Sequence, residues 1–177
     1  MDVVLATFET YEYLKTRFSE LIIFDFEAPK DTLYASLNRQ LFSWTIENLV
    51  KNGIDAMKGK GALKITIKSS EKYIFIQVAD TGKGISKNRF QKIFEPGFTS
   101  KKRGWGLGLS LSKRIVEDYH NGKIKVLQSQ INQGTTFQIS FSYVQAGLVN
   151  YSICIHLLLT REYRPTRQNP GCQYLRL

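Results

Sequence analysis

Cysteine is scarce in this sequence, and its two copies, Cys154 and Cys172, lie near the C-terminus. They form neither a disulfide framework nor a metal-binding spacing, and they indicate a reducing compartment or an incidental pair. The N-terminal residues include acids and no apolar core long enough for a signal peptide. The most apolar run, residues 144–159, contains polar side chains and is shorter than the roughly 20 residues that span a membrane. We therefore expect a cytoplasmic domain with no membrane contact of its own.

Acidic residues are also in the minority. The chain has 25 Lys and Arg against 15 Asp and Glu, which gives a formal net charge of +10. This excess is typical of proteins with an anionic partner, such as nucleic acid, a membrane surface or a nucleotide, but a basic surface kept soluble by lysine explains it equally well. The lysines are scattered and no platform of aromatic and basic residues is evident, which argues against a nucleic-acid-binding module.

The length of 177 residues suits one domain with a sizeable core and an appendage. The composition changes after about residue 143. All sixteen lysines lie at or before Lys125, and Glu162 is the only acid between Tyr119 and Leu177. We predict three segments: residues 1–19, a domain over 20–143, and an atypical tail over 144–177 that we expect to be poorly ordered.

Hydrophobic periodicity predicts an α+β fold. Helices are expected over residues 3–19, 30–61 and 107–120, with a shorter helix within 81–94. Strands are expected over residues 21–27, 63–70, 73–80, 123–130 and 135–143. Alternating apolar and polar positions in the strands predict a mixed, mainly antiparallel sheet with helices on one face.

The long predicted helix carries a polar stripe over "ENLVKNGIDAM". Asn48 and Asn52 lie one helical turn apart, so both carboxamide oxygens can face a hard cation such as Mg²⁺. Glu47, Lys51 and Asp55 fall largely on the same face. Taken alone, this segment is more simply explained as a solvated polar face.

A second polar motif, "DTGKG", follows a predicted strand. Asp80 at the strand end is able to accept a hydrogen bond from an amine deep in a pocket, and Gly82 and Gly84 would let a flat ligand approach the backbone. The same five residues by themselves are more often a plain turn.

The third motif, "KKRGWGLGL", opens the last predicted helix. Backbone amides at a helix N-terminus bind phosphate, and residues 101–103 add positive charge just upstream. The spacing of Gly104, Gly106 and Gly108 matches neither the P-loop nor the dinucleotide fingerprint. A flexible loop before a capped helix is the alternative explanation.

The order of these motifs, with "FEPGF" at residues 94–98 between the last two, resembles the catalytic and ATP-binding domain of bacterial sensor histidine kinases, in the GHKL ATPase superfamily. The resemblance covers about residues 20–143 and is strongest to the nitrogen-regulator type. It implies a two-layer α/β sandwich of the Bergerat type, with ATP and Mg²⁺ as cofactors and a mobile lid over about residues 96–106.

The resemblance also implies roles for individual residues. Asn52, with Asn48 one turn earlier, would hold Mg²⁺, and Asp80 would receive the adenine amine. The other residues that it implies for nucleotide binding are Asp55, Gly82, Gly84, Ile85, Phe94, Gly104, Gly106, Leu107, Gly108, Leu109, Thr135 and Thr136.

Two positions depart from the family pattern. Gly53 stands where many members have alanine, at a cost of roughly 1 kcal/mol in a helix interior. Asp55 stands where many have lysine. Lys101, Lys102 and Arg103 would then meet the phosphate charge instead, and we count them with Asn48 and Asn52 as candidate catalytic residues.

The sequence contains two histidines, His120 and His156, and neither lies in a phosphoacceptor motif. We expect His120 to be structural. The resemblance thus implies a protein histidine kinase fragment without its acceptor histidine, and residues 1–19 as linker from a missing dimerisation region. Its partners would be a histidine-bearing dimerisation domain and a response regulator receiver domain, with no nucleic acid. A non-catalytic nucleotide-binding module and another type of GHKL ATPase are the alternatives.

Overall fold

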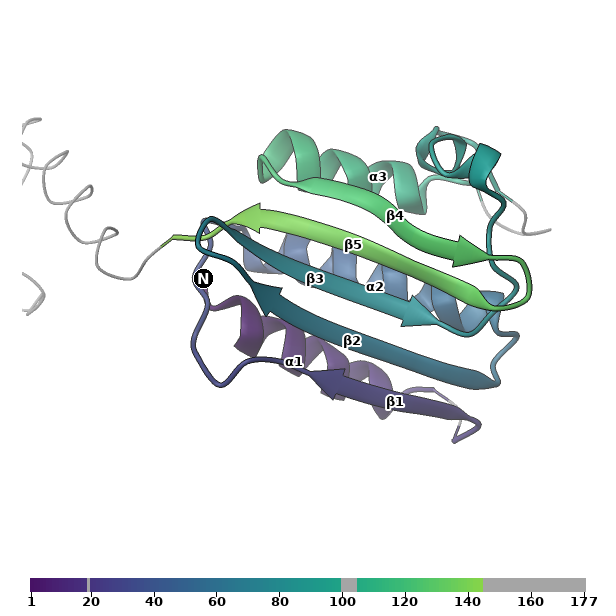
Figure 1. Cartoon of the computed structure of the whole chain (residues 1–177), viewed down its shortest axis with the longest axis horizontal. Helices are drawn as coiled ribbons and strands as arrows, with labels where there is room; N and C mark the ends of the chain where they lie inside the picture. The colour runs from purple at the N-terminus through teal and green to yellow at the C-terminus, as the bar shows by residue number, and fades with distance from the viewer. Residues whose placement is uncertain (19, 100–104, 145–177) are drawn as a thin grey trace, which may run out of the picture. The chain divides into compact units, whose positions relative to one another are not determined.

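Five strands form one mixed sheet, and helices cover one of its faces (Figure 1). The computed structural model describes residues 1–18, 20–99 and 105–144. The strands are β1 (Ile22–Glu27), β2 (Gly61–Ser69), β3 (Tyr73–Asp80), β4 (Lys123–Gln130) and β5 (Gly134–Ser142), and the helices are α1 (Val3–Lys15), α2 (Arg39–Ala56) and α3 (Gly108–Arg114). The predicted two-layer α/β sandwich is confirmed.

The strand order is β1-β2-β3-β5-β4. Strands β1 and β2 are parallel, with α2 as the crossover between them, and the other neighbours are antiparallel. Because β3 and β5 run in opposite directions, Asp80 at the end of β3 pairs with Thr135 at the start of β5. The end of one motif therefore lies beside the start of another.

The core lies between the sheet and the helices. Alternate residues of β3 are buried, namely Ile74, Ile76 and Val78, which is the period-2 pattern of a strand with one covered face. On α2 the buried positions recur at helical spacing, at Phe42, Ile46, Leu49, Val50 and Gly53. The buried side chains of β3 and of α2 therefore pack together in one hydrophobic core.

The predicted start of the long helix is wrong. Helix α2 begins at Arg39 rather than at residue 30, because Asn38 is extended and its side chain accepts a hydrogen bond from the N–H of Leu41 at 3.1 Å. This is an N-cap, which fixes a helix start. The preceding residues pair with the N-terminal segment instead, since the N–H of Val3 donates to the carbonyl of Leu33 at 2.8 Å.

Helix α1 packs into the same core through Val3, Ala6, Tyr11 and Leu14. It ends at Lys15, four residues before the predicted end. The described residues up to Val144 belong to one compact unit. The assignment of residues 1–19 to a linker stays a prediction, and the predicted tail lies outside the described residues except for Val144.

The helix predicted over residues 107–120 has two parts. Helix α3 is followed by a π-helical turn, Ile115–Tyr119, and Asn121 ends it with a positive φ of 51°. A residue in this left-handed conformation is a common helix stop. The short helix predicted within residues 81–94 consists of two 3₁₀ turns, Lys87–Arg89 and Lys92–Phe94.

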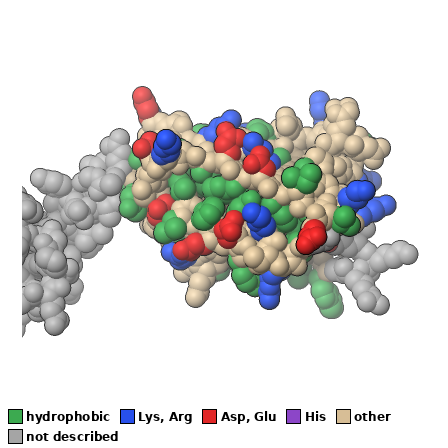
Figure 2. All heavy atoms as spheres, turned by 90° about the horizontal axis from the view of Figure 1, so that it is seen from below, with side chains coloured by type: hydrophobic (Ala, Val, Ile, Leu, Met, Phe, Trp, Pro, Cys, Tyr) green, Lys and Arg blue, Asp and Glu red, His purple; other side chains and the backbone are tan. Residues whose placement is uncertain are grey.

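Strand β1 lies at one edge of the sheet, and Figure 2 views the molecule from the side of this edge. Apolar side chains gather on the face seen in Figure 2. Leu5 and Phe8 of α1 are exposed large hydrophobic residues. On β1, Asp25 and Glu27 form ion pairs with Lys64 of β2 at 3.0 and 2.8 Å. Charged side chains on an edge strand discourage pairing with another chain.

None of the helices in the part of the chain that the structure describes is both long and apolar enough to cross a membrane.

His120 connects the end of the π-helical turn to the start of α2. Its Nε2 accepts the backbone N–H of Asn38 at 3.1 Å, and its ring lies edge-on to Phe141. Its Nδ1 is buried without a hydrogen-bond partner. Burial lowers the pKa of the imidazole from its ordinary value of 6.5, so the folded protein favours the neutral imidazole.

We expect acid to destabilise the domain through His120. Because folding lowers the pKa of this base, the unfolded state takes up the proton at a higher pH than the folded state does. The contribution of the neutral imidazole to folding stability is therefore complete above its ordinary pKa and is lost as the pH falls. Between about pH 7.5 and about pH 5.5, the melting temperature should fall more for the wild type than for His120→Gln. Melting temperatures that fall by the same amount in the two proteins across this range would contradict this role of His120.

Candidate functional site

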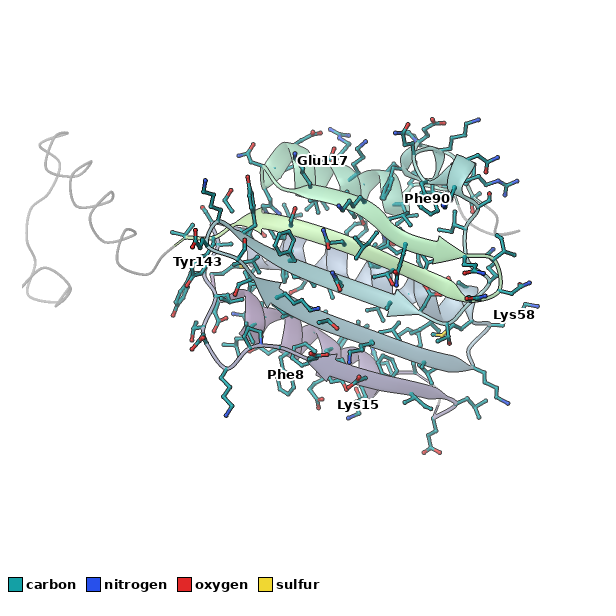
Figure 3. The ribbon with its side chains drawn as sticks, in the orientation of Figure 1. Phe8, Lys15, Lys58, Phe90, Glu117 and Tyr143 are labelled. Carbon is teal, nitrogen blue, oxygen red and sulfur yellow. The ribbon has the colours of Figure 1, made fainter. Side chains whose placement is uncertain are left out.

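A cavity of about 740 Å³ lies between the C-terminal half of α2, the end of β3 and the start of α3. Lys58, just beyond α2, and Tyr143, just beyond β5, mark opposite ends of the sheet, and the cavity lies at the Lys58 end (Figure 3). The residues that line it are Asn48, Asn52, Asp55, Ala56, Asp80, Lys83, Gly84, Ile85, Ser86, Arg89, Ile93, Phe98, Thr99, Trp105, Gly106, Leu107, Gly108, Leu109, Ile131, Asn132, Thr135 and Phe137. All three predicted polar motifs contribute.

Asp80 is the buried carboxylate of the cavity, with 7 % of its surface exposed. Burial raises the pKa of its carboxyl, while hydrogen bonds from backbone N–H groups of Gly82 and Thr135 act in the opposite direction. The bond from Gly82 to Oδ1 measures 2.8 Å. A buried acceptor of this kind is costly without a donor, and it is therefore suited to receive an amine from a ligand.

The glycines of "DTGKG" serve backbone packing. Gly84 has a φ of +68°, and a Cβ there would lie 2.0 Å from the carbonyl oxygen of Gln130. A Cβ on Gly82 would lie 2.6 Å from the carbonyl carbon of Ala56. The turn is thus fixed between the end of α2 and the β4–β5 turn. Gly84 lines the cavity, but Gly82 does not.

Asn48, Asn52 and Asp55 line the cavity from α2, as their spacing predicts. Glu47 and Lys51 pair with each other at 2.5 Å and are not among the lining residues. Within the described ranges, no group of three or more His, Cys, Asp or Glu residues could hold a metal ion. The oxygen donors on α2 fit Mg²⁺, which is commonly held by one or two protein ligands together with substrate phosphates.

The start of α3 contributes backbone to the cavity through residues 106–109. Gly106 has a φ of +65°, and its carbonyl accepts the N–H of Gly97 at 3.2 Å, so the two ends of the predicted lid are joined. Phe98, Thr99 and Trp105 also line this side. Lys101, Lys102, Arg103 and Gly104 lie outside the described residues.

Besides Gly82, two further predicted contacts, Phe94 and Thr136, do not line the cavity. Phe94 is buried and its ring packs against Phe137 at 6.3 Å, so it supports the cavity wall from behind. Thr136 alternates with Thr135 along β5 and is not a lining residue, whereas Thr135 is.

Several site residues were missed by sequence reasoning. Lys83 and Arg89 line the cavity, although Lys83 lies within the quoted "DTGKG" motif. Ser129 of β4 was also missed: its hydroxyl accepts the N–H of Ile85 at 2.7 Å and lies 2.9 Å from the Thr135 hydroxyl. No local signal marks Ser129, because strand pairing alone brings it to the glycine turn.

A mixed α/β sandwich with oxygen donors on a helix, a buried carboxylate at a strand end and exposed helix-start backbone defines a nucleotide-binding protein. The sequence profile of the histidine kinase-, DNA gyrase B-, and HSP90-like ATPases matches residues 38–145, more than half of the chain. The chain belongs to this family.

Similar proteins include sensor kinases. Sporulation kinase A of Bacillus subtilis (strain 168) is 36% identical over 112 residues, which cover 63% of this chain and 18% of that protein. The catalytic domain of histidine kinase ThkA superposes with a TM-score of 0.72 at 31% identity, covering 80% of this chain and 93% of that one. A structure of ThkA in complex with the response regulator protein TrrA superposes with a TM-score of 0.70 at 27% identity. The match covers 81% of this chain and 41% of that one. The chain thus spans less than a fifth of sporulation kinase A.

We expect Gly84→Ala to destabilise the domain strongly. The substitution adds both a strained φ and a collision with the Gln130 carbonyl, which cannot move without shifting the β4–β5 turn. Gly59→Ala is the matched control, since Gly59 has a φ of +79° but open space around its Cβ position. The control should lose about 1 kcal/mol of unfolding free energy, and Gly84→Ala at least twice as much. Equal losses in urea unfolding would contradict the packing role.

Proposed function

We propose that this chain is the ATP-binding catalytic domain of a two-component sensor histidine kinase. It transfers the γ-phosphoryl group of ATP to a histidine on a separate dimerisation domain, and a response regulator receiver domain takes the phosphoryl group next. The observation that carries the proposal is the buried Asp80 carboxylate at one end of a 740 Å³ cavity whose other wall is the start of α3. The protein acts in the cytoplasm, and its nitrogen-regulator subtype stays a prediction.

Asp80 receives the exocyclic amine of adenine. Gly82 and Thr135 already donate to the carboxylate, whose two oxygens together keep acceptor capacity for a further donor from the cavity. Thr135 lies beside it through the β3–β5 pairing, and Ser129 holds the Thr135 hydroxyl in place. The base therefore meets a preorganised polar wall, with Ile85 as an apolar surface next to it.

The phosphates lie toward α2 and the start of α3. Asn52, with Asn48 one turn earlier, would supply oxygen ligands for Mg²⁺, which when bound would neutralise phosphate charge, and Asp55 lines the cavity beside them. Residues 106–109 line the same space, and their backbone N–H groups at the helix start are the proposed donors to phosphate oxygens. Lys101, Lys102 and Arg103 are the proposed mobile cations of the lid.

The acceptor imidazole comes from another domain. The Nε2 of His120 already accepts the N–H of Asn38. His120 also lies twelve residues after Gly108, the first residue of α3, which corresponds to about 18 Å along a helix and places it away from the cavity. In-line transfer requires the acceptor at the γ-phosphate itself. His120 is therefore a structural residue in this proposal.

Asp80→Asn tests the nucleotide site. The amide oxygen keeps the bond to Gly82, so the amide NH₂ faces the adenine amine and two donors oppose each other. We expect ATP affinity to fall about 10-fold to 100-fold, as for a lost hydrogen bond to a charged group. Asp25→Asn, on the exposed edge strand, is the control. Titration calorimetry with unchanged affinity for Asp80→Asn would overturn the ATP site.

Phosphoryl transfer is tested in trans. With γ-labelled ATP and Mg²⁺, the chain alone should remain unlabelled, and a histidine-bearing dimerisation domain should become labelled when the chain is added. Asp80→Asn should abolish this label. Labelling of the chain at His120 would refute the proposal, and ATP binding without any labelling of the partner would favour a non-catalytic nucleotide-binding module.

A further inference from the structure

A buried polar contact joins α2 to α3. The side-chain Nδ2 of Asn48 donates to the hydroxyl of Ser112 at 2.8 Å. Ser112 is completely buried, with 0 % of its surface exposed. A hydroxyl in such a position is unfavourable unless it is hydrogen-bonded, and an apolar residue would otherwise pack there more favourably. Ser112 is thus matched to Asn48.

The absence of a side chain on Gly108 makes this contact possible. Gly108 is the first residue of α3, and a Cβ there would lie 2.6 Å from Oδ1 of Asn48. The Asn48 carboxamide therefore occupies the space beside the helix start while its nitrogen bonds to Ser112 one turn further on. Leu107, at the N-cap position, makes no side-chain capping bond.

The same contact separates the roles of the two asparagines. Asn52 and Asn48 both line the cavity from α2, but the carboxamide of Asn48 lies against α3 through Gly108 and Ser112. Since α2 carries the proposed metal ligand and the start of α3 carries the proposed phosphate-binding amides, the distance between these helices sets the geometry of the phosphate site.

We propose that Ser112 is a positioning residue, which acts through Asn48 to hold the start of α3 against α2. This inference rests on the proposed nucleotide site. Ser112 itself touches no ligand. Gly108 is required here because the Asn48 side chain needs its space, independently of any approach of phosphate to the backbone.

The direct test compares Ser112→Thr with Ser112→Val. The two side chains have the same shape, and only threonine keeps the hydroxyl, so any packing strain is shared. We expect Ser112→Val to bind Mg²⁺-ATP about fivefold more weakly than Ser112→Thr, the size of one hydrogen bond. In the nucleotide-free protein, amides of residues 108–112 should exchange with deuterium faster in Ser112→Val. Thr7→Val is the control, because the buried Thr7 hydroxyl bonds within α1, to the carbonyl of Val3 at 2.6 Å; it should change neither measurement.

A double-mutant cycle tests the role of Gly108 independently. Gly108→Ala should weaken ATP binding in the wild type by displacing the Asn48 carboxamide. In an Asn48→Ala background the space is already empty, so Gly108→Ala should have little further effect. An equal loss in both backgrounds would overturn the inference, because Gly108 would then act on the ligand alone.

The outcomes also separate the inference from the function. Equal ATP binding and equal amide exchange for Ser112→Thr and Ser112→Val refute the positioning role while leaving the ATP site intact. A wild-type chain that binds no ATP refutes the proposed function, whereas the exchange experiment still tests the contact, since it needs no nucleotide.

Discussion

The close approach of α2 to the sheet at Gly53 determines the geometry of the whole site. A Cβ at this position would lie 3.1 Å from Cβ of Asp80 and 3.2 Å from Cδ1 of Leu63, so the helix touches the ends of β2 and β3. This contact brings Asn52 and Asp55, on the neighbouring helix surface, next to the buried Asp80. Glycine costs roughly 1 kcal/mol in a helix interior. At Gly53 this cost comes with a contact between helix and sheet that is closer than most residues with a Cβ allow.

Strand pairing supplies the rest of the cavity wall from residues that are distant in sequence. Because Asp80 pairs with Thr135, the "DTGKG" turn leaves β3 beside the β4–β5 turn, where the N–H of Asn132 donates to the carbonyl of Lys83 at 2.9 Å. The N–H of Lys83 in turn donates to the carbonyl of Ala56 at the end of α2, at 3.1 Å. One residue thus ties a helix end to a hairpin turn. The backbone of this wall is fixed before any ligand binds, which lowers the entropic cost of binding.

The sequence was most informative where a motif is local. The strands and the polar face of α2 follow from their period, and Asp80 follows from its place at a strand end. The predicted start of α2 is too early because apolar residues such as Leu33 and Leu37 imitate helical spacing, whereas the Asn38 cap makes the helix begin at Arg39, nine residues later than predicted. Ser129 and Ser112 carry no local signal, since each has a partner more than forty residues away, Ile85 for Ser129 and Asn48 for Ser112. Of the predicted glycines, Gly84, Gly106 and Gly108 line the cavity and Gly82 does not. Gly82 and Gly84 pack closely against backbone in a way that no local rule reveals.

The two sides of the cavity differ in how far they are closed, and this difference bears on the direction of transfer. The wall around Asp80 is buried and braced by hydrogen bonds, whereas on the lid side Trp105 is 87 % exposed and Leu107 is 53 % exposed. In the proposed function, a nucleotide with its base at Asp80 would direct its phosphates toward the side lined by Trp105 and Leu107. Exposed apolar side chains at that opening are also what a docking domain would cover, because burying them removes apolar surface from water. In the proposed function, the hydrogen-bonded end at Asp80 would hold the base, and the end lined by Trp105 and Leu107 would face the second domain.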